Sequence, residues 1–148
     1  MMRDALPHLS QDHGELNRRV LAISAQLRRE SGSASSLAYS LVDLRELMFT
    51  HFAREEEGVF PFVAERIPAL ASRVQEMAIA HDTICGALSR ACHLASTAGD
   101  RAQLLALYER FEQAYAAHAH SEAELFETLD RQLDASDREH LAALVQGV

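Results

Sequence analysis

The apolar residues of this chain recur every three or four positions, which is the spacing of amphipathic α-helices. Turn-forming residues at positions 31–36, 67–68 and 96–100 divide this pattern into four long segments. A capping-box sequence from Ser136 to Glu139 predicts the start of a short helix near the C-terminus. No segment shows the alternation that is typical of strands. The pattern therefore predicts an all-α fold, an up-down-up-down four-helix bundle with a short C-terminal helix.

One face of each segment carries a heptad row of mainly apolar residues, which we call the seam. The seams are Leu9, His13, Leu16, Val20, Ile23, Leu27; Leu37, Leu41, Leu44, Met48, His51, Glu55; Leu70, Val74, Met77, His81, Ile84, Leu88; and Leu104, Phe111, His118, Glu122, Leu125, Leu129. Each seam contains one histidine at a position that would otherwise be apolar. Along the chain, each of these histidines is about 12 to 17 residues away from the neighbouring turn segments. Because successive helices run in opposite directions, these similar distances bring all four histidines to one level of the bundle.

Two of the seam histidines are followed four residues later by a glutamate, in the pairs His51–Glu55 and His118–Glu122. Residues four apart lie on the same helix face, so each imidazole and its carboxylate point to the same place. One buried histidine alone is more often a hydrogen-bonded core residue than a metal ligand. Four imidazoles and two carboxylates buried together would carry a large desolvation cost, which bound cations relieve.

This donor set predicts which metal ions the bundle can hold. Imidazole and carboxylate ligands without sulfur suit iron, manganese or zinc. Two carboxylates from different helices can each bridge two ions, which favours a dinuclear centre over a single zinc. Two histidines per ion, both carboxylates and a solvent-derived oxygen bridge would leave one position open on each ion, as in sites that bind small molecules.

Several other residues are expected to lie outside this site. His8, His93, His120 and His140 fall off the seams and are predicted to be surface residues. Glu56 and Glu57 belong to a charge run and are predicted to be solvated. Cys85 lies one turn beyond His81, but it and Cys92 are about 10 Å apart along one helix and are expected to be reduced core thiols.

Composition narrows the possible partners. The net charge of −8 argues against nucleic acids and anionic membranes, because both require a basic surface. All 14 cationic residues are arginine, which excludes Schiff-base chemistry and a P-loop lysine. No signal peptide or membrane span is apparent, so we expect a cytoplasmic protein. Its length predicts a single domain over residues 1–148.

The motifs resemble one known family. The chain contains His13 in the sequence Asp-His-Gly-Glu-Leu, His51 and Glu55 followed by Val-Phe-Pro, His81, and His118 and Glu122 followed by Leu-Phe. Together these motifs are similar to those of the hemerythrin-like (HHE cation-binding) domain. The resemblance covers essentially the whole chain. It implies two iron ions, joined by an oxo or hydroxo bridge and by the two glutamates. His13 and His51 would bind one iron, and His81 and His118 the other.

The chain departs from the oxygen-carrying members of this family at Met77, where those proteins have a fifth histidine. The resemblance therefore implies the four-histidine members, which are associated with sensing of oxygen or nitric oxide, peroxide handling and iron-centre repair. We expect a non-haem di-iron protein that binds O₂, NO or peroxide and acts mainly in sensing or binding during oxidative, nitrosative or iron stress.

The alternatives are a di-iron enzyme of the peroxidase, catalase or oxidase type, an iron-centre repair protein, and an adaptor bundle whose metal is structural or absent. Manganese and zinc are less favoured than iron. The protein partner is left open, and the chain is expected to be a monomer or a homodimer.

Overall fold

The computed structural model describes residues 6–29, 32–97 and 99–146. Its elements are α2 (Pro7–Arg28), α3 (Ala34–Arg54), the π-helical turn η1 (Glu55–Val59), α4 (Phe60–Arg66), the 3₁₀ turn η2 (Pro68–Leu70), α5 (Ala71–Ser96), α6 (Arg101–Gln132) and α7 (Ala135–Gln146). These residues form no strand, and the predicted all-α class is confirmed.

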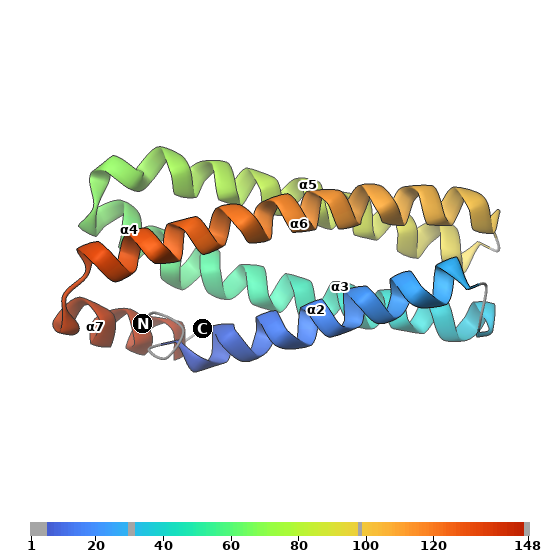
Figure 1. The fold of residues 1–148 in the computed structure, drawn as a ribbon, viewed down its shortest axis with the longest axis horizontal. Helices are drawn as coiled ribbons and strands as arrows, with labels where there is room; N and C mark the ends of the chain where they lie inside the picture. The colour runs from blue at the N-terminus through green and yellow to red at the C-terminus, as the bar shows by residue number, and fades with distance from the viewer. Residues whose placement is uncertain (1–5, 30–31, 98, 147–148) are drawn as a thin grey trace.

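Four long rods lie side by side in the structure (Figure 1). They are α2, α3 with its extension through η1 and α4, α5, and α6. The chain reverses at the end of each rod, so the predicted up-down-up-down bundle is confirmed. The short helix α7 folds back at the end of the bundle where α2 begins.

The loops end the helices largely as their residues predict. Ser33 caps α3 by accepting a hydrogen bond from the Ser36 amide at 3.0 Å, while Gly32 takes a φ of 80° that favours glycine. Asp100 caps α6 through the Ala102 amide, also at 3.0 Å. Of the predicted break at 31–36, residue 31 lies outside the described part of the chain.

The capping box of α7 differs from the one that the sequence predicts. Asp134 and Asp137 exchange reciprocal bonds, in which each side chain accepts from the amide of the other at 2.8 and 3.2 Å. Ser136 therefore lies inside the first turn, and the predicted Ser136–Glu139 box is wrong by two residues. The reason is that Leu133 is buried and extended at the end of α6, which places Asp134 at the capping position.

The second rod is not the continuous α-helix that the sequence predicts. Residues 55–59 form a π-helical turn, which adds about one residue to the helical repeat. Within it, a Cβ on Gly58 would lie 3.4 Å from a methyl group of Val145 in α7, which is van der Waals contact. α7 thus packs directly on the turn that begins with Glu55.

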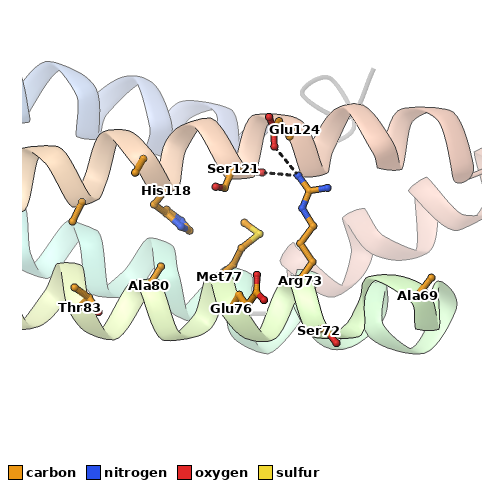
Figure 2. A pocket seen from close by; sticks show the side chains of 12 residues that line it. Ala69, Ser72, Arg73, Glu76, Met77, Ala80, Thr83, His118, Ser121 and Glu124 are labelled. Carbon is orange, nitrogen blue, oxygen red and sulfur yellow. Dashed lines mark hydrogen bonds and ion pairs between the residues drawn. The ribbon is translucent and has the colours of Figure 1, made fainter.

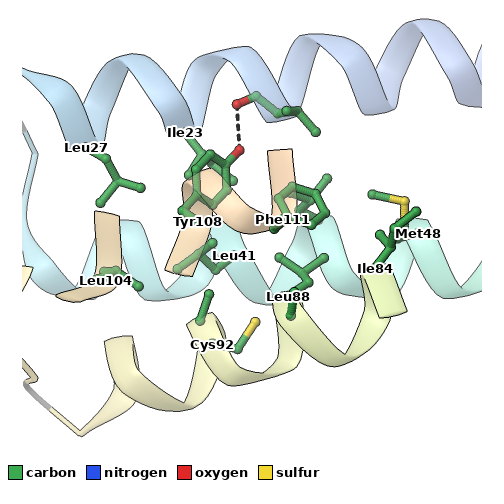
Figure 3. Close-up of a cluster of buried hydrophobic side chains, with 14 of the residues drawn as sticks. Ile23, Leu27, Leu41, Met48, Ile84, Leu88, Cys92, Leu104, Tyr108 and Phe111 are labelled. Atoms are coloured by element: carbon green, nitrogen blue, oxygen red, sulfur yellow. Dashed lines mark hydrogen bonds between the residues drawn. The ribbon is translucent and has the colours of Figure 1, made fainter. Parts of the chain in front are cut away.

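The seam residues form the core, in two apolar clusters. One cluster includes Leu41, Leu88, Tyr108 and Phe111, and the Tyr108 hydroxyl donates to the backbone oxygen of Val20 at 2.6 Å (Figure 3). The other cluster consists of Leu6, Leu9, Val59, Phe60, Phe62, Val63, Val74, Met77, Leu125, Leu129, Leu133, Leu141 and Val145. On every long rod the seam histidine lies in sequence between residues of the two clusters, so the histidines form a polar layer across the bundle.

Candidate metal centre

The structure brings the predicted donor residues together at one level of the bundle. They are His13 on α2, His51 on α3, Glu55 at the start of η1, His81 on α5, and His118 and Glu122 on α6. All are buried except His13, whose side chain is 30% exposed. The register argument from the sequence therefore placed these six side chains correctly relative to one another.

Glu55 lies at the middle of this arrangement. Its Oε1 atom is 3.3 Å from Nε2 of His51 and 3.3 Å from Nε2 of His81. The two imidazoles come from different helices, so one carboxylate joins α3 to α5 across the core. This is the position from which a carboxylate can serve two cations at once.

Glu122 makes the corresponding contacts on the other side. Its Oε1 atom is 3.2 Å from Nε2 of His13, and its Oε2 atom is 3.7 Å from Nε2 of His118. His81 and His118 also approach each other, with their Nε2 atoms 3.0 Å apart. Every Nε2 atom of the four seam histidines thus lies near a carboxylate oxygen of the layer.

The donors fall into two overlapping groups in which one atom from each residue lies within 4.8 Å of the others. The four-donor group contains His13, His51, Glu55 and Glu122. The three-donor group contains Glu55, His81 and His118. Glu55 belongs to both groups, so the two groups adjoin each other in one layer.

Several buried polar atoms of this layer lack ordinary partners. Among the described residues, none of the Glu55 carboxylate oxygens, His51 Nε2 and Glu122 Oε1 makes a hydrogen bond of good geometry, although Glu55 Oε1 lies 3.3 Å from two imidazole nitrogens. Glu55 is fully buried. Burial raises its pKa, but the neighbouring His81, His51 and His118 outweigh this effect and hold the pKa below its ordinary value. A buried carboxylate in this state is costly unless it is compensated, and a cation provides that compensation.

His118 is already in the protonation state that metal binding requires. Burial lowers the pKa of its imidazole to about 4, so the ring is neutral near pH 7. A neutral imidazole offers a nitrogen lone pair to a cation. Its Nδ1 atom is buried and has no hydrogen-bond partner among the described residues.

Asp12 contacts His51, a member of the four-donor group, at the ring nitrogen that faces away from Glu55. Its Oδ2 atom accepts from His51 Nδ1 at 3.2 Å and from Nη1 of Arg54 at 2.6 Å. Burial raises the pKa of Asp12, but these two hydrogen bonds and the nearby charges outweigh it, so the pKa is lowered. A carboxylate on Nδ1 fixes the tautomer of the ring and leaves Nε2 as the donor to a metal.

Glu56 has the equivalent role for His81. Its Oε2 atom lies 3.2 Å from His81 Nδ1, although 41% of its side chain is exposed. The sequence predicted that Glu56 and Glu57 are solvated, and both are exposed. It did not predict that Asp12 and Glu56 contact the Nδ1 atoms of His51 and His81. The available signals were weak: Asp12 precedes His13, and Glu56 follows Glu55.

Aromatic rings surround the three-donor group. Phe52 stacks on His81 with ring centroids 3.6 Å apart and planes 6° apart, and Phe60 stacks on the same imidazole at 5.4 Å. Phe52 also meets the edge of His118 at 5.6 Å. These contacts fix the ring of His81 and lower the local dielectric around the donors.

The sequence comparisons agree with this geometry. The profile of the family described as hemerythrin HHE cation binding domain matches residues 4–129.

The chain belongs to the hemerythrin HHE cation-binding family.

No match was found among curated proteins or solved structures. The hemerythrin match contains the six donor residues and ends before α7, so the helix that packs against Gly58 lies outside it. The chain is thus a hemerythrin-like cation-binding domain whose histidine and glutamate groups can hold metal. Within the described residues, no helix has a stretch that is both long and apolar enough to cross a membrane.

The remaining histidines of this hemerythrin domain lie away from the centre. The side chain of His120 is 78% exposed and lies 3.1 Å from Glu124, and His93 and His140 are exposed as predicted. The side chain of His8 is outside the described part of the structure.

Both cysteines are free thiols and belong to neither donor group. Burial, together with the charges of Asp82 and Glu56, raises the pKa of Cys85 to about 11, so it is a poor metal ligand near neutral pH.

Proposed function

We propose that this hemerythrin-like domain is a non-haem di-iron protein that binds O₂, NO or peroxide, and that it acts in sensing or binding these molecules. The observation that carries the proposal is the position of Glu55, which is fully buried, lies 3.3 Å from imidazole nitrogens of two helices and belongs to both donor groups. A carboxylate shared in this way supports a pair of cations. The residues that would hold them are His13, His51, Glu55, His81, His118 and Glu122.

The chemistry of the donors supports iron. All of them are imidazole nitrogens or carboxylate oxygens, and neither donor group includes a thiol. Manganese and zinc accept similar ligands and are the less favoured choices. Iron, when bound, supplies coordination positions and redox states to which O₂, NO or peroxide can bind. With only four and three protein donors, both groups leave room for such a ligand.

One side chain beside the centre, Tyr115, is poorly suited to the proton transfer that turnover of a ligand requires. A cavity of about 120 Å³ lies against His13, His51, His118 and Glu122, and it is also lined by Tyr115. The Tyr115 hydroxyl donates to Asn17 at 2.6 Å, and burial raises its pKa to about 12. It is therefore a poor source of protons for a bound ligand near pH 7.

Optical spectroscopy of the iron-loaded protein tests this function. The reduced protein, prepared anaerobically, is exposed to NO, and the oxidised protein is exposed to azide. Each ligand is expected to change the visible spectrum with saturation. A fully iron-loaded protein whose spectrum responds to neither ligand would have a closed, structural site, and the proposal would be wrong.

Repeated additions of hydrogen peroxide separate the binding function from the enzymatic alternative. A binding protein responds once, with a spectral change in proportion to the iron present. Continued consumption of many equivalents of peroxide per chain would instead identify a di-iron peroxidase or catalase.

A further inference from the structure

A groove between α5 and α6 reaches the candidate metal centre from the side. It has a volume of about 710 Å³, and its lining includes Met77 and Ala80 on α5 and Ala114, Ala117 and His118 on α6. Figure 2 shows the Met77 side chain reaching from α5 towards α6, between His118 and Arg73. The small side chains of the alanines leave the space between the two helices open beside a predicted metal ligand.

The groove reaches the centre at His118, a member of the three-donor group. Among the described residues that line the groove, His118 is the one donor, and it also lines the small cavity beside His13 and His51. A cation held by three protein donors has more free coordination positions than one held by four. Met77, which is almost fully buried, occupies the groove next to this group without being one of its donors.

The charges at the groove favour uncharged molecules. Arg73 donates to the Ser121 backbone oxygen and to Glu124, both at 3.3 Å, so its positive charge is already paired. Glu76 also lines the groove and is exposed. The two carboxylates outnumber the single guanidinium, and this excess of negative charge disfavours approaching anions.

We infer that the groove between α5 and α6 is the access route and binding space for an uncharged small ligand, which reaches the three-donor half of the centre past Met77. The ligand class is NO, O₂, hydrogen peroxide or a short organic hydroperoxide, since all of these are uncharged near pH 7 and fit within about 710 Å³. This inference rests on the proposed function for its biological meaning. The groove itself can be tested without iron.

The iron-independent test uses the methionine methyl groups. In diamagnetic protein, metal-free or zinc-loaded, an uncharged nitroxide should broaden the methyl NMR signal of Met77 and spare that of Met48, which is fully buried in the core. An anionic nitroxide of similar size should broaden Met77 less. The variant Ala117→Phe should protect Met77 from both probes. If Met77 is as protected as Met48 from the uncharged probe, the groove is closed and the inference is wrong.

The second test measures how fast NO binds to the reduced, iron-loaded protein. Three exposed alanines of α6 provide a matched series: Ala117 lines the groove, Ala119 lines the small cavity at the four-donor group, and Ala106 lines neither. Ala117→Phe should slow NO association several-fold at unchanged iron content. Ala106→Phe should match the parent, and Ala119→Phe should slow NO association less than Ala117→Phe does.

Two results of the kinetic test would overturn the inference. Slowing by Ala119→Phe alone would assign access to the small cavity, and equal rates in all variants would place the route elsewhere. If the parent protein takes up no iron or no NO, the proposed function has failed. The NMR experiment then still decides whether the groove admits an uncharged molecule.

Discussion

The two halves of the candidate metal centre share Glu55 and each contain two seam histidines, but they differ in the number of donors and in their surroundings. The four-donor half includes the partly exposed His13, is backed by Asp12 and Arg54, and adjoins a cavity of only about 120 Å³. In the three-donor half, Phe rings stack on a fully buried histidine. This half opens to a groove of about 710 Å³.

The comparison shows how one layer of similar ligands can serve two purposes. The half with more protein donors adjoins only a small cavity. In the half with fewer donors a bound cation would keep more coordination positions free, beside a groove that is open to the surface. We interpret the first as the anchor of the centre and the second as the place where a ligand binds.

The largest effect is expected from Glu55→Gln, because this residue belongs to both halves. The amide keeps the shape of the side chain but removes the charge that balances two cations. We expect the loss of both ions, measured as metal per chain by elemental analysis, and a lower Tm because bound metal stabilises the fold. Glu57→Gln, at an exposed position nearby, is the control. If Glu55→Gln retains both ions, Glu55 is not a ligand of the centre.

Single histidine replacements distinguish the halves. His118→Ala leaves two protein donors in its group, and His51→Ala leaves three in the other. Both variants should lose metal and melt at a lower temperature, with the greater loss for His118→Ala. His120→Ala and His93→Ala should behave like the parent, since both residues are exposed. Equal effects from all four variants would mean that the site has been misplaced.

The carboxylates behind the histidines should have smaller effects. Asp12→Asn and Glu56→Gln are each expected to weaken metal binding by about 10- to 100-fold, as is typical when such a partner is removed. Asp12→Asn should have the greater effect, because the Asp12 side chain is 13% exposed and that of Glu56 is 41% exposed. Competition with a chelator measures both affinities. The opposite order would contradict the view that the four-donor half is the anchor.

The smallest of these effects should come from Met77→His, which offers one more imidazole to the three-donor half. The expected result is unchanged iron content with weaker, several-fold slower binding of NO. Met77→Leu conserves volume and should match the parent. If Met77→His leaves ligand binding unchanged, Met77 does not lie on the path to the ligand position.

Much of the fold and of the candidate site follows from periodicity alone. The seams placed Leu41, Leu88 and Leu125 in the core and put His51 and His118 at the same level, because helical repeat and chain reversal are local properties. Leu70 and His13 are the seam positions that remain partly exposed. His13 lies at the open edge of the donor layer, which a repeat pattern cannot show.

The missed features depend on tertiary contacts. The π-helical turn forms where α7 packs on Gly58, and no local pattern in residues 55–59 indicates that contact. Its consequence, Glu56 beside His81, was therefore missed as well. Asp12 precedes a predicted ligand, but its partners His51 and Arg54 belong to another helix, so its role required the packed bundle.

The measurement that tests the central claim most directly is the metal content of the protein purified after expression in iron-replete medium. If Glu55 joins two cation positions, elemental analysis should approach two irons per chain, and Glu55→Gln should reduce this value towards zero. A reproducible content of one zinc and no iron per chain would contradict the di-iron centre.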